Sequence, residues 1–265
     1  MKIVVCVKHV PDAQGDRGFA ADTTTDREAV DGLLSELDEY AVEEALRLRE
    51  AGEDIEVVAL TVGPDDARDA LKKALQMGAD GAVLVSDEAV HGSDAVGTSL
   101  VVARALQHVG FDLVLTGMAS TDGSMGVVPA MVAERLGLPQ VTYASEVTVT
   151  GGAGGTVRVR RDGDAASETV EASLPALVSV TDQVNEPRYP SFKGIMAAKK
   201  KPVTELALAD IGVDPSEVGL DAAWARAVEA TARPPKQAGT VVTDEGDPAA
   251  TAARVVEFLA AQKLV

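Results

Sequence analysis

One segment of the chain is rich in glycine and in side chains that donate hydrogen bonds. It reads Gly117-Met118-Ala119-Ser120-Thr121-Asp122-Gly123-Ser124-Met125-Gly126-Val127-Val128, directly before Pro129. Small residues let the backbone approach a ligand closely, and a helix that starts near Pro129 would turn free N–H groups toward an anion. The pattern predicts a phosphate cradle, while an ordinary strand-to-helix turn prefers the same residue types.

Two other segments end apolar runs in the same way. Cys6 to His9 close the β-branched run Ile3–Val7, and Thr61 to Gly63 close the run Ile55–Val62. Ligands of open α/β sheets sit beyond the carboxyl ends of the strands, where the strand order reverses. All three segments are therefore candidate ligand sites. Cys6, a lone cysteine in an apolar strand, is expected to be a small buried hydrophobe rather than a reactive thiol.

Motifs of common catalytic and metal sites are missing. The sequence has no P-loop lysine motif, and no Gly-x-Gly-x-x-Gly follows the first apolar run, which argues against a standard NAD site there. It has no Gly-x-Ser-x-Gly elbow and no cysteine–histidine pair in a credible context. The single cysteine excludes an intrachain disulfide, and His9, His91 and His108 are too scattered for a metal site. We expect neither a catalytic residue nor a metal.

A second segment has a composition that does not suit the core of the fold. It runs from Asn185 to Pro202 and reads Asn-Glu-Pro-Arg-Tyr-Pro-Ser-Phe-Lys-Gly-Ile-Met-Ala-Ala-Lys-Lys-Lys-Pro. Prolines, a glycine and an isolated phenylalanine are poor core material, so the segment is expected to touch something outside the core. Phe192 is either a local loop anchor or an exposed binding residue. The lysines 199–201 are expected to be a solvated surface.

Alternating strands and helices must position these segments. Strands are expected at 3–7, 55–62, 81–85 and 113–116, with helices from Ser35 to Gly52, over 65–77 and from Ser93 or Asp94 onward. Ser35, with Asp38 three positions on, resembles a capping box. The order predicts an α/β fold with a doubly wound, mostly parallel sheet, Rossmann-like and of the adenine-nucleotide-binding type.

After Gly137 the residue pattern changes from alternating strands and helices to strands alone. Strands are expected at 140–150 and 156–161 around a glycine-rich turn, which predicts a β-hairpin extension. Two more strands are expected at 169–173 and 176–180, the second apolar enough for the interior of the sheet. Beyond Lys201 the chain is looser until Asp247-Pro248, which reads as a cap and a first-turn proline. The helix that follows has one apolar side, formed by Ala252, Val255, Val256 and Leu259. It can pack on this chain or on another one.

Composition excludes several classes of protein. Asp and Glu number 42 against 24 Lys and Arg, for a formal net charge of -18. That charge would repel a polyanion, so nucleic acid is not an expected partner. The apolar run at the N-terminus is too short for a signal peptide or a membrane span. We expect a protein of the cytoplasm without membrane insertion.

Several segments together resemble one known family. They are Val-Cys-Val-Lys-His-Val-Pro at residues 5–11, Glu-Tyr-Ala-Val-Glu-Glu-Ala at 39–45, Ala-Leu-Gln-Met-Gly-Ala-Asp at 74–80, residues 136–142, and the segment from Asn185 to Pro202. In order and spacing they resemble the beta subunits of electron transfer flavoproteins, over essentially the whole chain. Relatives commonly have a Lys-Gln pair where this chain has Met118-Ala119, and an acidic residue followed by Thr-Gly-Gln where it has residues 124–127. Fewer polar side chains are therefore expected at the ligand.

The resemblance implies a heterodimer that carries electrons and is not itself an enzyme. The alpha subunit would hold the redox-active FAD, and this chain would bind AMP in a structural role. Electrons would come from acyl-CoA dehydrogenases and similar flavoenzymes and pass to a membrane quinone oxidoreductase. Two alternatives stay open: an electron-bifurcating flavoprotein with FAD in place of AMP, and a stand-alone nucleotide-binding protein of the same fold.

The resemblance also assigns residues and regions. The AMP site would consist of Cys6, a second wall of Ser35, Glu36, Leu37 and Asp38, a third wall at Val62, and the cradle 117–128. Docking to dehydrogenases would fall to Tyr189, Pro190, Ser191, Phe192, Lys193, Gly194, Ile195 and Met196. The expected division is a nucleotide-binding α/β domain at 1–184, a partner recognition loop and basic segment at 185–201, and an arm at 202–265 that packs on the alpha subunit.

Overall fold

The computed structural model describes residues 1–52, 54–231, 234, 238–239, 241–243 and 246–265. Its contacts divide the chain into two compact units, Met1–Ala230 and Thr231–Val265. The first unit is built on a nine-stranded sheet with the order β11-β5-β4-β1-β6-β10-β7-β8-β9. The strands are β1 Lys2–Cys6, β4 Glu56–Val62, β5 Gly81–Val85, β6 Leu113–Gly117, β7 Gln140–Thr150, β8 Thr156–Asp162, β9 Ser167–Ser173, β10 Ala176–Val180 and β11 Val203–Leu206.

The sheet is parallel from β11 to β7, and β8 pairs antiparallel with both β7 and β9. From β1 the chain moves to β4 and β5 on one side and then returns to β6 on the other side. The strand order therefore reverses between β1 and β6, which opens a crevice at their carboxyl ends. The predicted doubly wound, mostly parallel α/β fold is confirmed.

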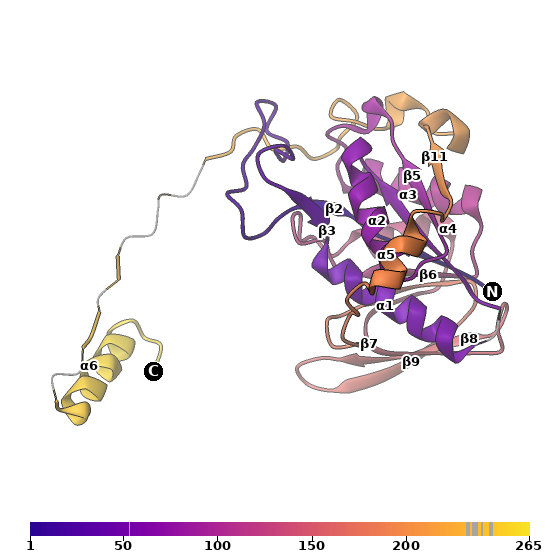
Figure 1. Ribbon diagram of the computed structural model, residues 1–265. Coiled ribbons are helices and arrows are strands. Elements are labelled where there is room, and N and C mark those ends of the chain that lie inside the picture. Colours follow the sequence, from indigo (N-terminus) through magenta and orange to yellow (C-terminus); the bar gives the residue numbers. More distant parts are fainter. Residues whose placement is uncertain (53, 232–233, 235–237, 240, 244–245) are drawn as a thin grey trace. The chain divides into compact units, whose positions relative to one another are not determined.

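Helices cover both faces of this sheet (Figure 1). On one face lie α1 Glu36–Ala51 and α2 Arg68–Met77, packed with Ile3 and Val5 of β1 in one core cluster. On the other face lie α3 Ala95–Val109 and α4 Val128–Leu136, packed with Val4 in a second cluster. Adjacent residues of β1 thus face opposite layers, which is why a continuous apolar run is required there. The other helices are α5 Phe192–Ala198 and α6 Pro248–Ala261.

Short elements complete the first unit. The strands β2 His9–Pro11 and β3 Gly32–Leu34 pair antiparallel inside the long polar connection between β1 and α1. Short 3-10 turns cover Asp65–Ala67, Glu88–Val90, Leu208–Ile211 and Pro215–Glu217. The predicted helix 65–77 accordingly begins with a 3-10 turn and becomes α-helical at Arg68.

The capping box predicted at Ser35 is wrong. No side chain caps the first turn of α1. The Ser35 hydroxyl accepts a bond from the Thr121 backbone N–H at 3.4 Å instead, and Asp38 is bonded to the ends of two strands. Both side chains are used for contacts with distant segments, so their spacing in the sequence imitates a local motif.

The second unit contains α6. Asp247 accepts bonds from the Ala249 and Ala250 backbone N–H groups at 3.1 Å each, which confirms the predicted cap before Pro248. None of its described residues is buried, and Val256 is 57% exposed. In the described part of the chain, no helix has the length and apolar character needed to cross a membrane.

Candidate functional site

A cavity of about 370 Å³ lies at the carboxyl ends of β1 and β6. The end of β1 supplies Cys6 and Lys8, α1 supplies Asp38, and β4 supplies Val62. The loop after β6 and the start of α3 form the remaining walls of the cavity. The site occupies the switch point of the sheet, where ligands of this architecture bind. From the loop after β6 the lining residues are Gly117, Ala119, Ser120, Asp122, Gly123, Met125, Gly126 and Val128.

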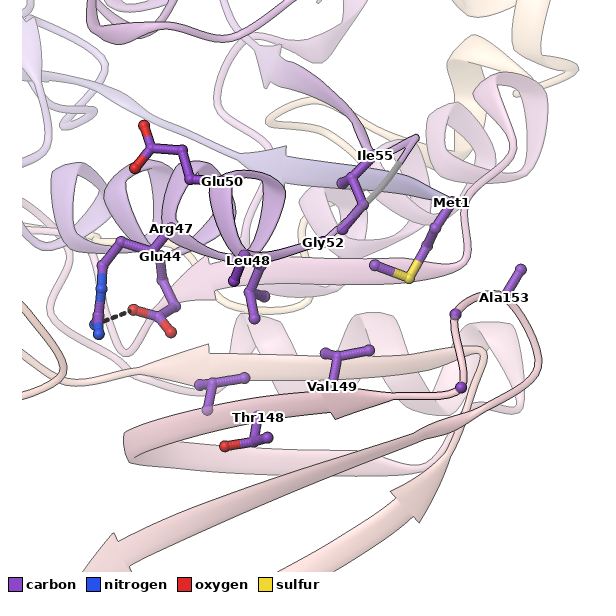
Figure 2. A pocket seen from close by; sticks show the side chains of 14 residues that line it. Met1, Glu44, Arg47, Leu48, Glu50, Gly52, Ile55, Thr148, Val149 and Ala153 are labelled. Atoms are coloured by element: carbon purple, nitrogen blue, oxygen red, sulfur yellow. Dashed lines mark hydrogen bonds and ion pairs between the residues drawn. The ribbon is translucent and has the colours of Figure 1, made fainter.

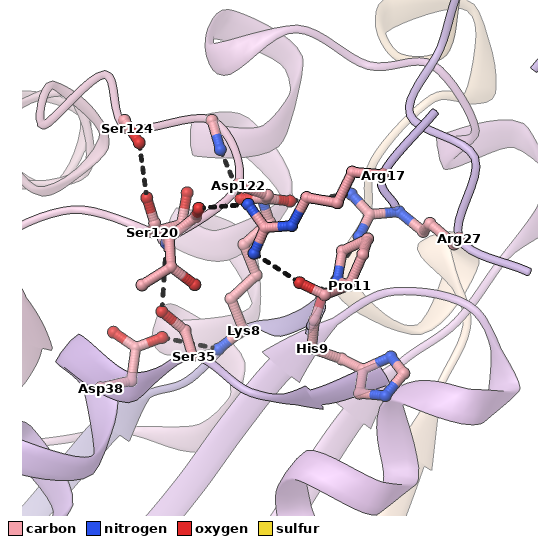
Figure 3. A network of polar contacts seen from close by, with 12 residues as sticks. Lys8, His9, Pro11, Arg17, Arg27, Ser35, Asp38, Ser120, Asp122 and Ser124 are labelled. Carbon is pink, nitrogen blue, oxygen red and sulfur yellow. Dashed lines mark hydrogen bonds and ion pairs between the residues drawn. The ribbon is translucent and has the colours of Figure 1, made fainter. Parts of the chain in front are cut away.

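Asp38 joins the two strands that flank the cavity. Its Oδ2 accepts a bond from the Lys8 backbone N–H at 2.9 Å, and its Oδ1 accepts one from Gly117 at 3.1 Å (Figure 3 shows the Lys8 bond). A Cβ at Gly117 would lie 2.6 Å from Asp38 Oδ1 and 2.7 Å from the Leu37 carbonyl oxygen, so only glycine fits there. Burial raises the pKa of Asp38 to about 7, although the two N–H bonds oppose the shift.

Asp122 gathers positive charge beside the cavity. Its carboxylate accepts a bond from Lys8 Nζ at 2.8 Å and one from Arg27 Nη2 at 3.4 Å, and its own side chain is only 5% exposed (Figure 3). Burial by itself would raise the pKa of Asp122, but the charge of Lys8 and hydrogen bonds from Lys8, Ser120 and Gly123 hold it well below its usual range. Two cations thus share one carboxylate on this wall, while the carboxylate of Asp94 lies at the start of α3 on the same cavity.

Arg17 fastens the segment between β2 and β3 over this wall. Its guanidinium donates to the carbonyl oxygens of Thr121 at 2.7 Å, Pro11 at 2.6 Å and Asp12 at 3.1 Å (Figure 3 shows the Pro11 bond). The long polar connection is therefore held against the loop after β6, and it brings Arg27 to the cavity.

The opposite wall of the cavity is apolar. Cys6, Val62, Val102, Val128 and Val132 line it. Cys6 is partly buried, packs against the apolar core and also lines the cavity. Burial and the nearby Asp38 raise the pKa of its thiol to about 12, so the thiol stays protonated and inert near neutral pH.

Most of the residues assigned to the site line the cavity, and some of the others are bonded to the loop after β6. Ser35 bonds Thr121, and Ser124 Oγ donates to the Ser120 carbonyl oxygen at 3.4 Å. The assigned residues that do not line the cavity are Ser35, Glu36, Leu37, Met118, Thr121, Ser124 and Val127.

Sequence reasoning missed several lining residues: Thr25, Arg27, Ser93, Asp94, Ala95, Thr98, Val102, Thr116, Pro129 and Val132. Val7 and Lys8 also line the cavity and lie in the segment from Cys6 to His9 that was a candidate by its position after the first strand. Arg27 lies in a connection without any periodic pattern, so only the fold brings it to the site.

A larger cavity of about 860 Å³ lies at the opposite edge of the sheet. Met1, Leu48, Ile55 and Val149 contribute apolar side chains to it, and Glu44 and Arg47 form an ion pair at one end (Figure 2). It lies where β1 begins, away from the carboxyl ends, so it is not the switch-point crevice.

The segment from Asn185 to Pro202 differs from the predicted loop. Residues 192–198 form α5, whose first turn is capped by Ser191 Oγ, which accepts a bond from the Gly194 N–H at 3.0 Å. Tyr189 is 92% exposed and Phe192 81%, which rules out the loop-anchor role considered for Phe192. Ile195 and Met196 are also exposed, at 37% and 48%.

The predicted solvated surface at residues 199–201 holds only for Lys199 and Lys200, which are exposed. Lys201 turns inward. Its Nζ donates to the carbonyl oxygens of Leu75, Gly78 and Ala79 at the end of α2. The unpaired carbonyls of a helix terminus explain this position, because a lysine there satisfies them.

Comparison with known proteins agrees with this architecture. A model of the electron transfer flavoprotein domain matches residues 22–211. The electron transfer flavoprotein subunit beta of Mycobacterium tuberculosis is 49% identical over 269 residues, 99% of each chain. That of Megasphaera elsdenii is 33% identical over the full length of both chains, and the caffeyl-CoA reductase-Etf complex subunit CarD of Acetobacterium woodii is 35% identical over 92% of each. The chain therefore belongs to the electron transfer flavoprotein family, on the side of its beta subunits.

Proposed function

We propose that this chain is the beta subunit of a heterodimeric electron transfer flavoprotein, with AMP held in the cavity between β1 and β6. Its alpha partner would hold the FAD that accepts electrons from acyl-CoA dehydrogenases and other flavoenzymes. The reduced pair would deliver them to a membrane quinone oxidoreductase. In this role the chain carries electrons and turns over no substrate of its own.

The cavity is the observation that carries the proposal. At about 370 Å³ it lies toward the small end of the range for ligand sites, roughly 300–1,000 Å³, which suits a mononucleotide. Its apolar wall at Cys6 and Val62 suits an adenine ring. Its other wall offers Lys8, Arg27 and the uncapped N-terminus of α4 to a phosphate.

The same proposal assigns the rest of the chain. Residues 1–184 form the nucleotide domain, 185–201 the docking and basic segment, and 202–265 the arm. Because β11 pairs with β5 in the sheet, the part of the arm that would pack on the alpha subunit is Thr231–Val265. The exposed apolar residues of α6, such as Val255 and Phe258, would be covered there.

The nucleotide content of the purified heterodimer tests the assignment. The chain would be co-expressed with its alpha subunit and the complex denatured, and the released nucleotides would be quantified by chromatography. One FAD and one AMP per heterodimer are expected. Recovery of no nucleotide would overturn the proposal. A stable homo-oligomer that ignores the alpha subunit in gel filtration would favour a stand-alone nucleotide-binding protein.

A bifurcating flavoprotein is the second candidate. The relative CarD, named as a subunit of a caffeyl-CoA reductase-Etf complex, is 35% identical and supports it. Two FAD and no AMP in the same measurement would select it.

Docking is tested separately at Phe192. Its side chain projects from the first turn of α5, and a bulky apolar tip is the usual form of an interface anchor. Phe192→Ala should slow reduction of the heterodimer by a dehydrogenase and leave the FAD and AMP content unchanged. Equal reduction rates in the variant and the wild type would remove Phe192 from the docking surface.

A further inference from the structure

The helix α5 is held on the body of the protein by one basic side chain before it and one after it. We propose that Arg188 and Lys201 are positioning residues that fix α5 in the orientation needed to engage a dehydrogenase. The inference rests on the proposed docking role of α5. It adds residues outside the docking surface itself, which act through backbone placement rather than through contact with the partner.

Arg188 binds α1 through a two-pronged ion pair. Its Nε lies 2.7 Å from Glu43 Oε2 and its Nη2 lies 2.9 Å from Glu43 Oε1, while Nη1 lies 2.5 Å from Glu50 Oε1. The Arg188 backbone N–H also donates to Glu43 Oε2 at 3.1 Å. Glu43 is only 5% exposed. Both the side chain and the backbone of Arg188 are thus fixed to a buried carboxylate, directly before Tyr189.

The residues just before Arg188 are bonded to the same helix. Asn185 Nδ2 donates to the Tyr40 carbonyl oxygen and to Glu44 Oε2, both at 3.0 Å. Arg47 Nη1 donates to Glu44 Oε2 at 2.9 Å and to the Val184 carbonyl oxygen at 3.2 Å (Figure 2 shows the Arg47–Glu44 pair). The chain therefore leaves the sheet along successive turns of α1 and has a fixed direction when it reaches α5.

Lys201 binds α2 on the other side. Its ammonium donates to the carbonyl oxygens of Leu75 at 3.1 Å, Gly78 at 3.0 Å and Ala79 at 2.5 Å. Three carbonyl acceptors use all three hydrogens of the ammonium. The chain after α5 is thereby tied to the C-terminal end of α2, immediately before β11 joins the sheet.

Between the two attachments, α5 lies directly against α2. A Cβ on Gly194 would lie 2.5 Å from the Gln76 carbonyl oxygen, so the two backbones are as close as glycine allows. The opposite side of α5 exposes Phe192 and Met196, which are four positions apart and share one helical face. A seven-residue helix is too short to be stable alone in water, so its shape and direction depend on these attachments.

An α5 that is already held in place before docking loses less conformational entropy when the partner binds. A free segment would lose backbone and side-chain freedom when a partner binds, and that loss subtracts from the affinity. Removing either attachment should therefore raise the KM of the dehydrogenase for the heterodimer and leave kcat unchanged, because the electron path inside the docked complex stays the same.

The test uses the complete heterodimer and an acyl-CoA dehydrogenase of the same organism, with its acyl-CoA as the reductant. The Arg188→Gln/Glu43→Gln double variant removes the ion pair without leaving a buried carboxylate unpaired, and it keeps the net charge. Lys201→Met removes the second attachment. Each should raise the KM about tenfold, a typical effect of lost preorganisation, with kcat, FAD and AMP contents unchanged. Amide hydrogen exchange should accelerate in 189–200 and not in β1 or β6.

Matched variants control for loss of charge. Arg158→Gln/Glu171→Gln removes an exposed ion pair on the hairpin, and Lys72→Met removes an exposed lysine of α2. Both should keep the wild-type KM. The inference is overturned if the double variant and Lys201→Met also keep it, or if the controls change it equally. If Phe192→Ala leaves the KM unchanged as well, it is the docking role of α5 that fails.

Discussion

Cys6 makes the cavity open to chemical measurement, because it is the only cysteine of the chain and lines the site. The reactive species in alkylation is the thiolate, and a thiol with a pKa of about 12 yields very little of it at pH 8. Iodoacetamide should therefore modify the folded protein far more slowly than the protein in guanidinium chloride, as followed by mass spectrometry. Similar rates in the two conditions would contradict the burial of this thiol.

Because the pKa of Asp38 is raised in the folded protein, its contribution to the free energy of unfolding should decrease as the pH rises. A carboxyl group with a lowered pKa has the opposite effect. The pKa of Asp38 is about 7 in the folded protein against 3.8 for an unperturbed aspartate, so between these values the folded state binds the extra proton. This residue's contribution is fully present below about pH 4 and is lost as the pH rises through 7.

The comparison with Asp38→Asn isolates that contribution. Denaturant unfolding of both proteins from pH 4 to pH 8 should show the wild type losing stability relative to the variant as the pH rises. The variant should be the less stable of the two at low pH, by about 1–3 kcal/mol, since an amide NH₂ would face a backbone N–H at Lys8 or Gly117. A difference that does not change with pH would show that Asp38 titrates normally.

At the scale of elements, the contact between α5 and α2 makes Gly194 irreplaceable. An alanine there must push the helices apart, because its Cβ would overlap the Gln76 carbonyl oxygen. Gly194→Ala should raise the KM of the dehydrogenase for the heterodimer and change the free energy of unfolding of the whole protein only slightly. Gly18→Ala is the control, since a Cβ at Gly18 meets no atom within 4 Å. A wild-type KM for Gly194→Ala would mean that α5 tolerates displacement.

The elements that sequence could predict are those with a long or complete apolar pattern. The bounds of β5, β7 and β10 were predicted to the residue, and those of β1 within one residue. The strands β5 and β10 are buried along their whole length, and β7 is long enough to show its pattern. β11 was missed, since its burial begins only at Leu206 and its other residues are exposed. α5 was missed because a seven-residue helix that is mostly exposed has no full apolar stripe.

The residues of the candidate site could likewise be predicted from the sequence only in part. The glycine-rich loop after β6 and Asp38 could be found from residue type and family resemblance. Arg27 could not, because only the fold brings its guanidinium to the His9 carbonyl oxygen and to Asp122. The mistaken capping box arose because a spacing of three residues carries no information about the distant N–H groups that Asp38 actually binds.

At the scale of the whole molecule, the two units should separate cleanly. The unit Met1–Ala230 contains the sheet and both core clusters, and none of the described residues of α6 is buried. A chain that ends at Ala230 should keep its unfolding transition. If Thr231–Val265 packs on the alpha subunit as proposed, that chain should no longer co-purify with it in a pull-down. Retention of the alpha subunit would place the main interface within the first unit.

The three consecutive lysines 199–201 look equivalent in the sequence but are not equivalent in the fold. Acylation requires a free amine that can reach the reagent. Lys199 and Lys200 meet that condition, whereas the ammonium of Lys201 is enclosed by three carbonyl oxygens. Brief treatment with acetic anhydride, followed by peptide mapping, should label the first two and spare the third. Loss of that protection would report directly that the end of α2 has opened.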